Sequence, residues 1–449
     1  MKAQRRNIPI KVAGQMKTAK STMAVALIVL LLPRLLQSQQ PGDAREWTLE
    51  KAMAHALENN LELKAAKQKV EVSKAEWLGA KALPFNPEVE AEQSSDSRYA
   101  NEGEKSVRLG LSQELEIFGQ RWVREDAAKY RWEAAQAEYS RLENSLIAGL
   151  REAFLNQLFF QKRRYTLMAV SEFDKEIWDS AQKRFAEGAI RQINLDLTRV
   201  EYNRARAEFL KADLEWTAGR LRLNRLLGLA DPLVETKFTG ELIFPPLKLT
   251  AEQAIQLALK HRGDFQAVQF EAKAAHKDLS LARREALPNL NLGIFYEREK
   301  SATENLRDDD KLLGFSIGLP LPLLNRNQGG RVRAFANMRF AELLASSAGL
   351  DVKAQAAEAH KRLSSAQELL QLYGDLETRL DKDLELVRKA YLQGQIPIED
   401  YLTQKDHFLQ AKLDFLDAYK NYSEARSALE QAVGLKWEQI VTAAQGEKK

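Results

Sequence analysis

Side chains that could bind a metal or catalyse a reaction are few in this sequence, and no spacing brings them together. There is no cysteine, and the histidines form no H-x-x-H or H-E-x-x-H pattern that would place two ligands on one helix face. The five histidines are His55, His261, His276, His360 and His407. No G-x-S-x-G sequence, phosphate-binding loop or dinucleotide fingerprint occurs. We therefore expect no enzyme activity, no cofactor and no metal site, and interpret the histidines as surface or packing residues.

One acidic run, Asp308-Asp309-Asp310, resembles a cation site in composition alone. It lies at the end of the polar segment 300–310, which we expect to be a hairpin loop. Consecutive acidic residues in such a loop are normally solvated. The sequence therefore gives little support to calcium binding there.

The elements that would position any site are present in two copies. Residues 48–57 reappear as residues 250–259, and two glycines keep nearly the same spacing, since Gly188 matches Gly394 and Gly228 matches Gly434. A repeat of about 200 residues is far longer than a solenoid repeat, so the pattern predicts two copies of one large module. The predicted boundaries are a signal peptide at 1–44, a first repeat at 45–228, a linker at 229–249, a second repeat at 250–440 and a polar tail at 441–449.

The N-terminal segment is typical of an export signal. Six basic residues precede an apolar run over 23–32, which Pro33 ends. Ten apolar residues are too few to span a bilayer as a helix but suit a secretory signal, with cleavage expected between 38 and 44. An uncleaved anchor, or a start at Met16, is the alternative. Residues 1–44 carry seven Lys/Arg and one Asp, so their removal changes the formal charge from +4 to −2. A nucleic-acid partner is therefore not expected.

The positions of proline predict very long helices. No proline occurs between Pro87 and Pro232 or between Pro322 and Pro397, and a helix interior excludes proline. We expect a helix of roughly 100 Å over 120–186, at about 1.5 Å per residue, with a counterpart over 330–392. Shorter helices are expected over 49–81, 194–227, 251–285 and 399–433.

Between the first short helix and the long helix of each copy, apolar and polar residues alternate as in strands. The expected strands cover 87–92, 107–112, 290–296 and 313–319, which gives two hairpins. Four strands cannot close a membrane barrel, and open edges are not tolerated in lipid. If the strands enter a membrane, several chains must share one barrel. A sheet packed on helices in water is the alternative.

The order of short helix, hairpin, long helix and short helix, present twice, resembles the TolC-type outer-membrane efflux proteins. Two segments carry the resemblance locally, namely residues 112–121 (SQELEIFGQR) and 319–329 (LPLPLLNRNQG), which follow the two hairpins. Both are most similar to the CzcC/CusC-like heavy-metal branch. The resemblance covers residues 46–440.

The resemblance implies a mainly helical fold with a pair of membrane hairpins. Three chains would form a homotrimer with a twelve-stranded barrel in outer-membrane lipid and a twelve-helix tunnel in the periplasm. This channel would be the passive exit duct of a tripartite efflux system for heavy-metal cations, docked through a periplasmic adaptor onto an RND-type inner-membrane pump. The alternatives are a multidrug or type I secretion channel, a periplasmic adaptor, or a structural coiled coil.

The resemblance also places the periplasmic mouth where each long helix turns into the next. The residues that it implies for adaptor docking at these turns are Gly188, Asn194, Leu195, Gly394, Asp400 and Leu402. Asp400 would also form a gate ring around the channel axis. Related proteins carry a second aspartate three residues later, whereas this chain has Thr403. A capped helix end with ordinary first-turn residues explains the same pattern without any docking.

Overall fold

The computed structural model describes residues 45–95, 105–241, 246–300, 309–373 and 376–446. The chain divides into residues 1–45 and residues 46–449, and the elements described below belong to the second unit, apart from Arg45. The expected signal peptide and Asp308 lie outside the described residues.

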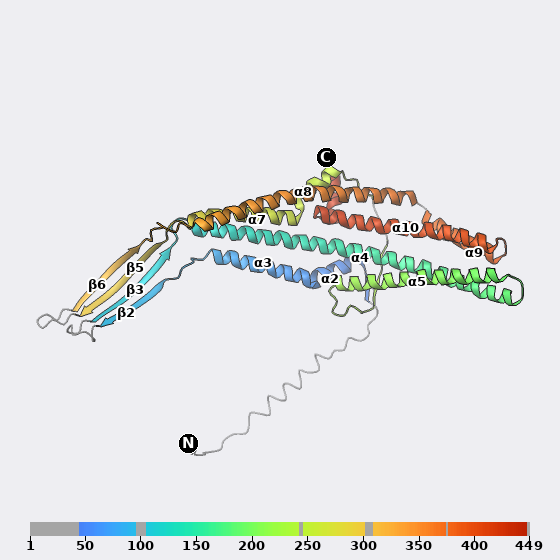
Figure 1. Cartoon of the computed structure of the whole chain (residues 1–449), viewed down its shortest axis with the longest axis horizontal. Helices are drawn as coiled ribbons and strands as arrows, with labels where there is room; N and C mark the ends of the chain where they lie inside the picture. Colours follow the sequence, from blue (N-terminus) through green and yellow to red (C-terminus); the bar gives the residue numbers. More distant parts are fainter. Residues whose placement is uncertain (1–44, 96–104, 242–245, 301–308, 374–375, 447–449) are drawn as a thin grey trace, which may run out of the picture. The chain divides into compact units, whose positions relative to one another are not determined.

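Long helices account for most of the described residues (Figure 1). In the first copy they are α2 (Leu49–Asn59), α3 (Leu61–Ala80), α4 (Gln120–Ala186) and α5 (Gln192–Leu226). In the second they are α6 (Ala251–His261), α7 (Gly263–Arg284), α8 (Gln328–Tyr373), α9 (Leu376–Leu392), α10 (Ile398–Val433) and α11 (Trp437–Gly446). The expected helix over 120–186 is confirmed by α4. None of the helices in the described part of the chain is both long and apolar enough to cross a bilayer.

Each expected first short helix is divided in two. Asn60 separates α2 from α3, and its side chain accepts a hydrogen bond from the Leu63 amide at 3.0 Å, which caps α3. Arg262 separates α6 from α7 at the matching place in the second copy. Asparagine and arginine are both tolerated inside helices, so the residue type at neither position predicts a break. Both breaks coincide with a close approach of another segment.

The approaching residue is the glycine that follows α5 in the first copy and α10 in the second. Gly228 has a φ of +74°, and a Cβ there would lie 2.8 Å from the Asn59 carbonyl oxygen. Gly434 has a φ of +75°, and a Cβ there would lie 2.8 Å from the Arg262 Cα. Backbone therefore meets backbone at both places, which only glycine allows. The two copies thus share the same internal joint.

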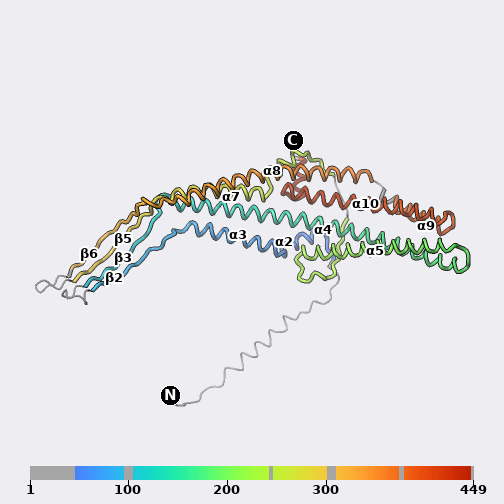
Figure 2. The backbone as a smooth tube through the Cα atoms, in the orientation of Figure 1, coloured from blue at the N-terminus to red at the C-terminus, as the bar shows by residue number. Residues whose placement is uncertain are grey.

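The helices α4 and α10 run antiparallel and are joined by three ion pairs. Arg151 pairs with Glu430 at 2.6 Å, Arg163 with Asp417 at 3.0 Å, and Lys405 with Asp174 at 2.9 Å. The pairs recur every 11 to 13 residues along both helices, which is close to three helical turns. One long helix of the first copy is thereby fixed along the second copy. Figure 2 shows α10 following α4 over much of its course.

The four strands form one antiparallel sheet in the order β2-β3-β5-β6. They are β2 (Glu88–Ser95), β3 (Lys105–Leu115), β5 (Leu290–Lys300) and β6 (Asp309–Gly318). Both expected hairpins are confirmed, and β3 additionally pairs with β5, which joins the two copies. The strands β2 and β6 are therefore free edges within the chain, and every residue of β2 is exposed.

The register gives the sheet one apolar and one polar face. The apolar face has four rows, which are Leu115–Leu290, Gln113–Leu292–Ile317, Val89–Leu111–Ile294–Phe315 and Ala91–Leu109–Tyr296–Leu313. Their apolar side chains are exposed in several places, with Phe315 at 80% and Ile317 at 76%. No helix covers these side chains, so the expected alternative of a sheet packed on helices is wrong for the described residues.

Two segments that we expected to be irregular, the linker and the polar tail, contain regular structure. The linker 229–249 holds β4 (Thr236–Phe238), which pairs with β1 (Arg45–Trp47) in a separate two-stranded sheet. The expected polar tail begins inside α11, whose Ile440 is fully buried and whose Val441 packs on the same core. The segment up to Gly446 is therefore part of the helical core rather than a free tail.

Candidate functional site

The two turns between consecutive long helices have the same backbone geometry. Gly188 has a φ of +73°, its amide donates to the Phe185 carbonyl at 2.9 Å, and the Ala189 amide donates to the Arg184 carbonyl at 2.8 Å. Gly394 has a φ of +72° and donates to the Tyr391 carbonyl at 2.9 Å. These are the two hydrogen bonds of a Schellman motif, which ends a helix with a left-handed residue. Nothing lies within 4 Å of a Cβ at either glycine.

Because only the backbone conformation restricts these turn glycines, their replacement has a modest and calculable effect. We expect Gly394→Ala to lower the free energy of unfolding by about 1 kcal/mol, the cost of a left-handed alanine. Gly434→Ala should cost at least twice as much, since its Cβ also meets the Arg262 backbone. Urea unfolding followed by circular dichroism measures both values. Equal losses in the two variants would contradict this prediction.

The expected docking residues differ in exposure. Asp400 is exposed in the first turn of α10 and has no hydrogen-bond or ion-pair partner among the described residues, and both turn glycines are exposed as well. Asn194 and Leu195, in the first turn of α5, are half-buried. Leu402 is half-buried against the cluster that holds Phe173 and Tyr401. Asp400 is therefore accessible to a partner, whereas Leu402 packs inside the chain.

The apolar residues that these turns do expose were not among the expected ones. Ile193 is 61% exposed at the start of α5, and Leu392 is 60% exposed at the end of α9. Both stand one or two residues from an expected position. Alternation of buried and exposed positions around each helix end could have identified them, but it requires the exact start of the helix, which sequence alone places poorly.

Behind the turns lies a buried cluster of ionisable side chains that the sequence did not reveal. The Lys405 ammonium donates to the Asp174 carboxylate at 2.9 Å and lies 3.5 Å from Glu201. The Tyr401 hydroxyl donates to the other Asp174 oxygen at 3.4 Å. The Lys405 and Asp174 side chains are only 6% and 2% exposed. The cluster thus ties α4, α5 and α10 together near the turns.

Burial dominates the electrostatics of this cluster. It raises the pKa of Asp174 above its usual value, although Lys405 acts in the opposite direction. Burial and the neighbouring Asp174 carboxylate also raise the pKa of Tyr401, so its hydroxyl stays protonated and serves as a donor. Asp174, Glu201 and Lys405 lie on three separate helices, and the carboxylate and ammonium that pair are 231 positions apart in the sequence. No local sequence pattern could have brought them together.

The polar face of the sheet is a second feature that sequence reasoning left unused. Along the register it carries seven carboxylates, which are Glu88, Glu90, Glu92, Glu114, Glu297, Glu299 and Asp310. Its single basic residue is Arg108, whose guanidinium lies 4.1 Å from the centre of the Phe295 ring. The alternation in 87–92 contained this signal, since glutamate fills every second position. The face as a whole is strongly negative.

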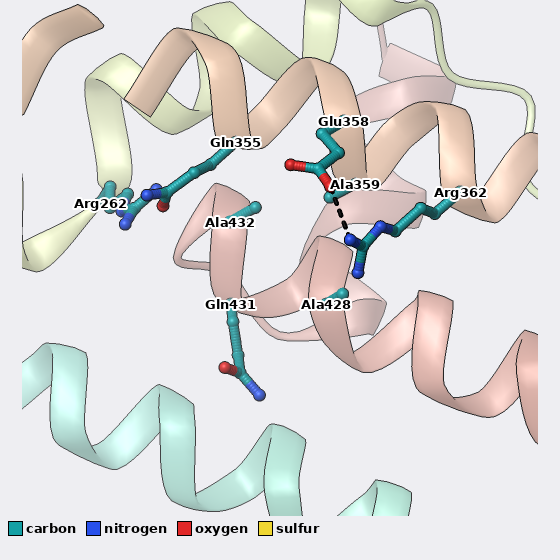
Figure 3. A pocket seen from close by; sticks show the side chains of 8 residues that line it. All are labelled: Arg262, Gln355, Glu358, Ala359, Arg362, Ala428, Gln431 and Ala432. Carbon is teal, nitrogen blue, oxygen red and sulfur yellow. Dashed lines mark hydrogen bonds and ion pairs between the residues drawn. The ribbon is translucent and has the colours of Figure 1, made fainter. Parts of the chain in front are cut away.

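No arrangement in the described ranges suggests catalysis or a bound metal. The described residues contain no group of three His, Asp or Glu side chains able to hold an ion. Two of the histidines have polar contacts on the protein: His360 meets the Leu249 carbonyl at 2.8 Å and His276 meets Glu342 at 3.0 Å. Figure 3 shows a surface pocket whose Arg362 is held by Glu358 at 2.6 Å. Its one carboxylate, Glu358, is engaged in that ion pair.

Comparison with known proteins agrees with this geometry. The family model described as "Outer membrane efflux protein" matches residues 52–229 and 254–435. The chain is 26% identical to the cobalt-zinc-cadmium resistance protein CzcC of Cupriavidus metallidurans over 285 residues, which are 63% of this chain. That match spans 64% of CzcC, which is less than two thirds of its length. The chain is also 21% identical to the cation efflux system protein CusC of Escherichia coli O157:H7 over 407 residues, 86% of each protein.

A crystal structure of a membrane protein from Pseudomonas aeruginosa has the same fold, with a TM-score of 0.72 and 19% identity over 86% of this chain and 92% of that one. This likeness confirms the expected fold class of long helices with a pair of hairpins. The matched family is one of efflux proteins and not an enzyme class. Since its model covers both repeats and most of the sequence, the chain belongs to the outer membrane efflux protein family.

Proposed function

We propose that the protein is the outer-membrane channel of a tripartite efflux system, in which three copies share one barrel. The observation that carries this proposal is the four-stranded sheet, which has an exposed apolar face, an acidic face and two free edges. Such a sheet satisfies its edge hydrogen bonds in lipid only when it joins other sheets into a closed barrel. Three copies give twelve strands, within the range of outer-membrane barrels.

The proposed cargo is a heavy-metal cation. The relatives CzcC and CusC are named for cobalt, zinc and cadmium resistance and for cation efflux. The chain itself supports this class of substrate through the acidic face of its sheet, which would line the barrel. A pore lined by carboxylates favours cations over anions. Selection among cations would belong to the inner-membrane pump.

The proposed partners dock at the two helical turns. A periplasmic adaptor would contact the exposed surface around Gly188 and Gly394 and link the channel to an RND-type pump. Both turns have the same backbone geometry, so one adaptor type could engage six similar tips in a trimer. We add Ile193 and Leu392 to the docking residues proposed from the sequence, because they are exposed and apolar. Asn194, Leu195 and Leu402 would act by supporting the turns.

Deleting the gene and measuring growth tests the proposal. We expect increased sensitivity to zinc, cobalt or cadmium and recovery when the intact gene is returned. Sensitivity to a panel of drugs instead would favour the multidrug alternative. Heat-sensitive trimer bands in the outer-membrane fraction would support the assembly. Protein that stays monomeric in detergent and conducts no ions in planar bilayers would overturn the proposed function.

Asp400 is proposed as a gate residue. Three exposed Asp400 carboxylates close to the channel axis would attract cations and narrow the mouth. We expect Asp400→Ala to raise single-channel conductance or to lower cation preference in planar bilayers. Glu399→Ala, at the neighbouring exposed position, is the matched control and should change neither. Unchanged conductance and selectivity in the Asp400 variant would remove it from the gate.

A further inference from the structure

The apolar face of the sheet becomes basic toward the hairpin ends. Beyond the row that contains Leu109 and Tyr296, the next two rows of the register hold four basic residues, which are Lys105, Arg298, Lys300 and Lys311. All four are exposed. Lys105 lies directly opposite Lys300, and Arg298 lies directly opposite Lys311. We call these four residues the basic girdle.

The opposite face of the same strands has the opposite charge. Glu297, Glu299 and Asp310 alternate with the girdle residues and therefore point to the polar face. Basic and acidic residues are thus on opposite faces of a single sheet. Asp309, which is opposite Lys300 in the register, is the exception. Water on both faces would not require such a separation. The two faces therefore meet different surroundings.

Like charges directly opposite each other on neighbouring strands destabilise a sheet. The girdle contains two such pairs, and an anion beside its three lysines would reduce their mutual repulsion. Its height on the sheet indicates which anion. From Leu115 to Leu109 the four apolar rows span six residues, roughly 20 Å along the strands, which is most of the apolar band of about 25 Å in outer-membrane barrels. The long basic side chains of the girdle extend beyond these rows toward the level of lipid headgroups.

We propose that the basic girdle binds the phosphate groups of a phosphorylated glycolipid in the membrane leaflet next to the hairpin ends. The inference rests on the proposed function, because it requires the apolar face to lie in lipid. The girdle presents cations from three adjacent strands, which suits a headgroup with two separated phosphates. Tyr296, one row below Arg298 on the same face, places an aromatic ring at the boundary, as is usual for barrel interfaces.

Binding of bisphosphoryl lipid A to the purified full-length assembly in detergent tests the proposal. The first variant replaces three girdle lysines with glutamine, at Lys105, Lys300 and Lys311. The control variant replaces three exposed lysines of α3, which are Lys64, Lys67 and Lys69, and so has the same change in net charge. We expect binding to weaken about fivefold for each girdle lysine replaced and to stay unchanged in the control. Monophosphoryl lipid A should bind less tightly than the bisphosphoryl form.

A cysteine introduced at Phe315 separates failure of this inference from failure of the proposed function. The native chain has no cysteine, so a bimane label is confined to that site. Quenching of the label by brominated phosphatidylcholine, together with girdle variants that bind lipid A like the native chain, would overturn the girdle alone. An unquenched label would overturn the membrane placement of the sheet. Equal weakening by the α3 control would also overturn the girdle, since net charge alone would then explain binding.

Discussion

We expect Lys405→Ala to lower the free energy of unfolding by about 3–5 kcal/mol, the usual cost of removing one partner from a buried ion pair. The change leaves the Asp174 carboxylate, which is 2% exposed, without its cation. Tyr401 alone would then donate to it, and a neutral hydroxyl cannot replace the positive charge of the Lys405 ammonium. Urea unfolding of the detergent-solubilised protein, followed by circular dichroism, measures the loss.

Two further variants define the cause of this loss. Lys389→Ala is the matched control, because Lys389 is 61% exposed and pairs with Glu385 at 3.7 Å. A pair of this kind contributes roughly 0.5 kcal/mol or less. The double variant Lys405→Met/Asp174→Leu removes both charges and should recover most of the stability. A Lys405→Ala protein as stable as the Lys389→Ala control would show that water reaches Asp174.

The position of this cluster links stability to function. Asp174 belongs to the first copy and Lys405 to the second, and both lie one to four turns from the helix ends that form the proposed mouth. Any opening that moves α10 away from α4 must separate these charges. Arg151 and Glu430 make the corresponding contact farther along the same helices, where Arg426 also pairs with Glu430 at 3.2 Å. The pair nearest the turns therefore resists opening most directly.

Sequence patterns were sufficient to predict the helices and strands. They were insufficient to predict where helices break and how the two copies pair. The absence of proline over 88–231 predicted α4, because proline is excluded from helix interiors and a long stretch without it is compatible with one long helix. The breaks at Asn60 and Arg262 were not predicted, and both coincide with the close approach of Gly228 and Gly434, which lie about 170 residues away in the sequence. The pairing of β3 with β5 could not be predicted either. It depends on how the two copies pack together, and the sequence pattern within one copy contains no information on that packing.

The candidate site was predictable to the same extent. Gly188 and Gly394 were identifiable because a left-handed helix end leaves a local requirement for glycine. The burial of Leu402 was not, because Phe173, which packs in the same cluster, is on another helix. The acidic face of the sheet needed the register as well as the sequence. Alternation places Glu90 on a polar face, but only the pairing of β2 with β3 and of β3 with β5 puts it on the same face as Glu297 and Glu299.

That face leads to the second large effect. We expect the triple variant Glu88→Gln/Glu90→Gln/Glu92→Gln to lose roughly tenfold in cation-over-anion permeability, the low end of the enrichment produced by charged pores. All three carboxylates are exposed on β2, and their removal leaves four against Arg108 on each chain. Reversal potentials of the purified channel across a salt gradient in planar bilayers measure the permeability ratio.

The matched control replaces Glu62, Glu71 and Glu76 on α3, which are equally exposed and give the same change in net charge. The two variants should differ because the electric field at a permeating ion depends on its distance from the charged side chains. At 0.1 M salt, the effect of charges more than about 10 Å from the ion is largely screened. Repeating the measurement at 1 M salt should narrow the difference. If the α3 variant lost selectivity as strongly as the β2 variant, the acidic face would not line the pore, and the proposed preference for cations would have to arise in the helical part of the channel.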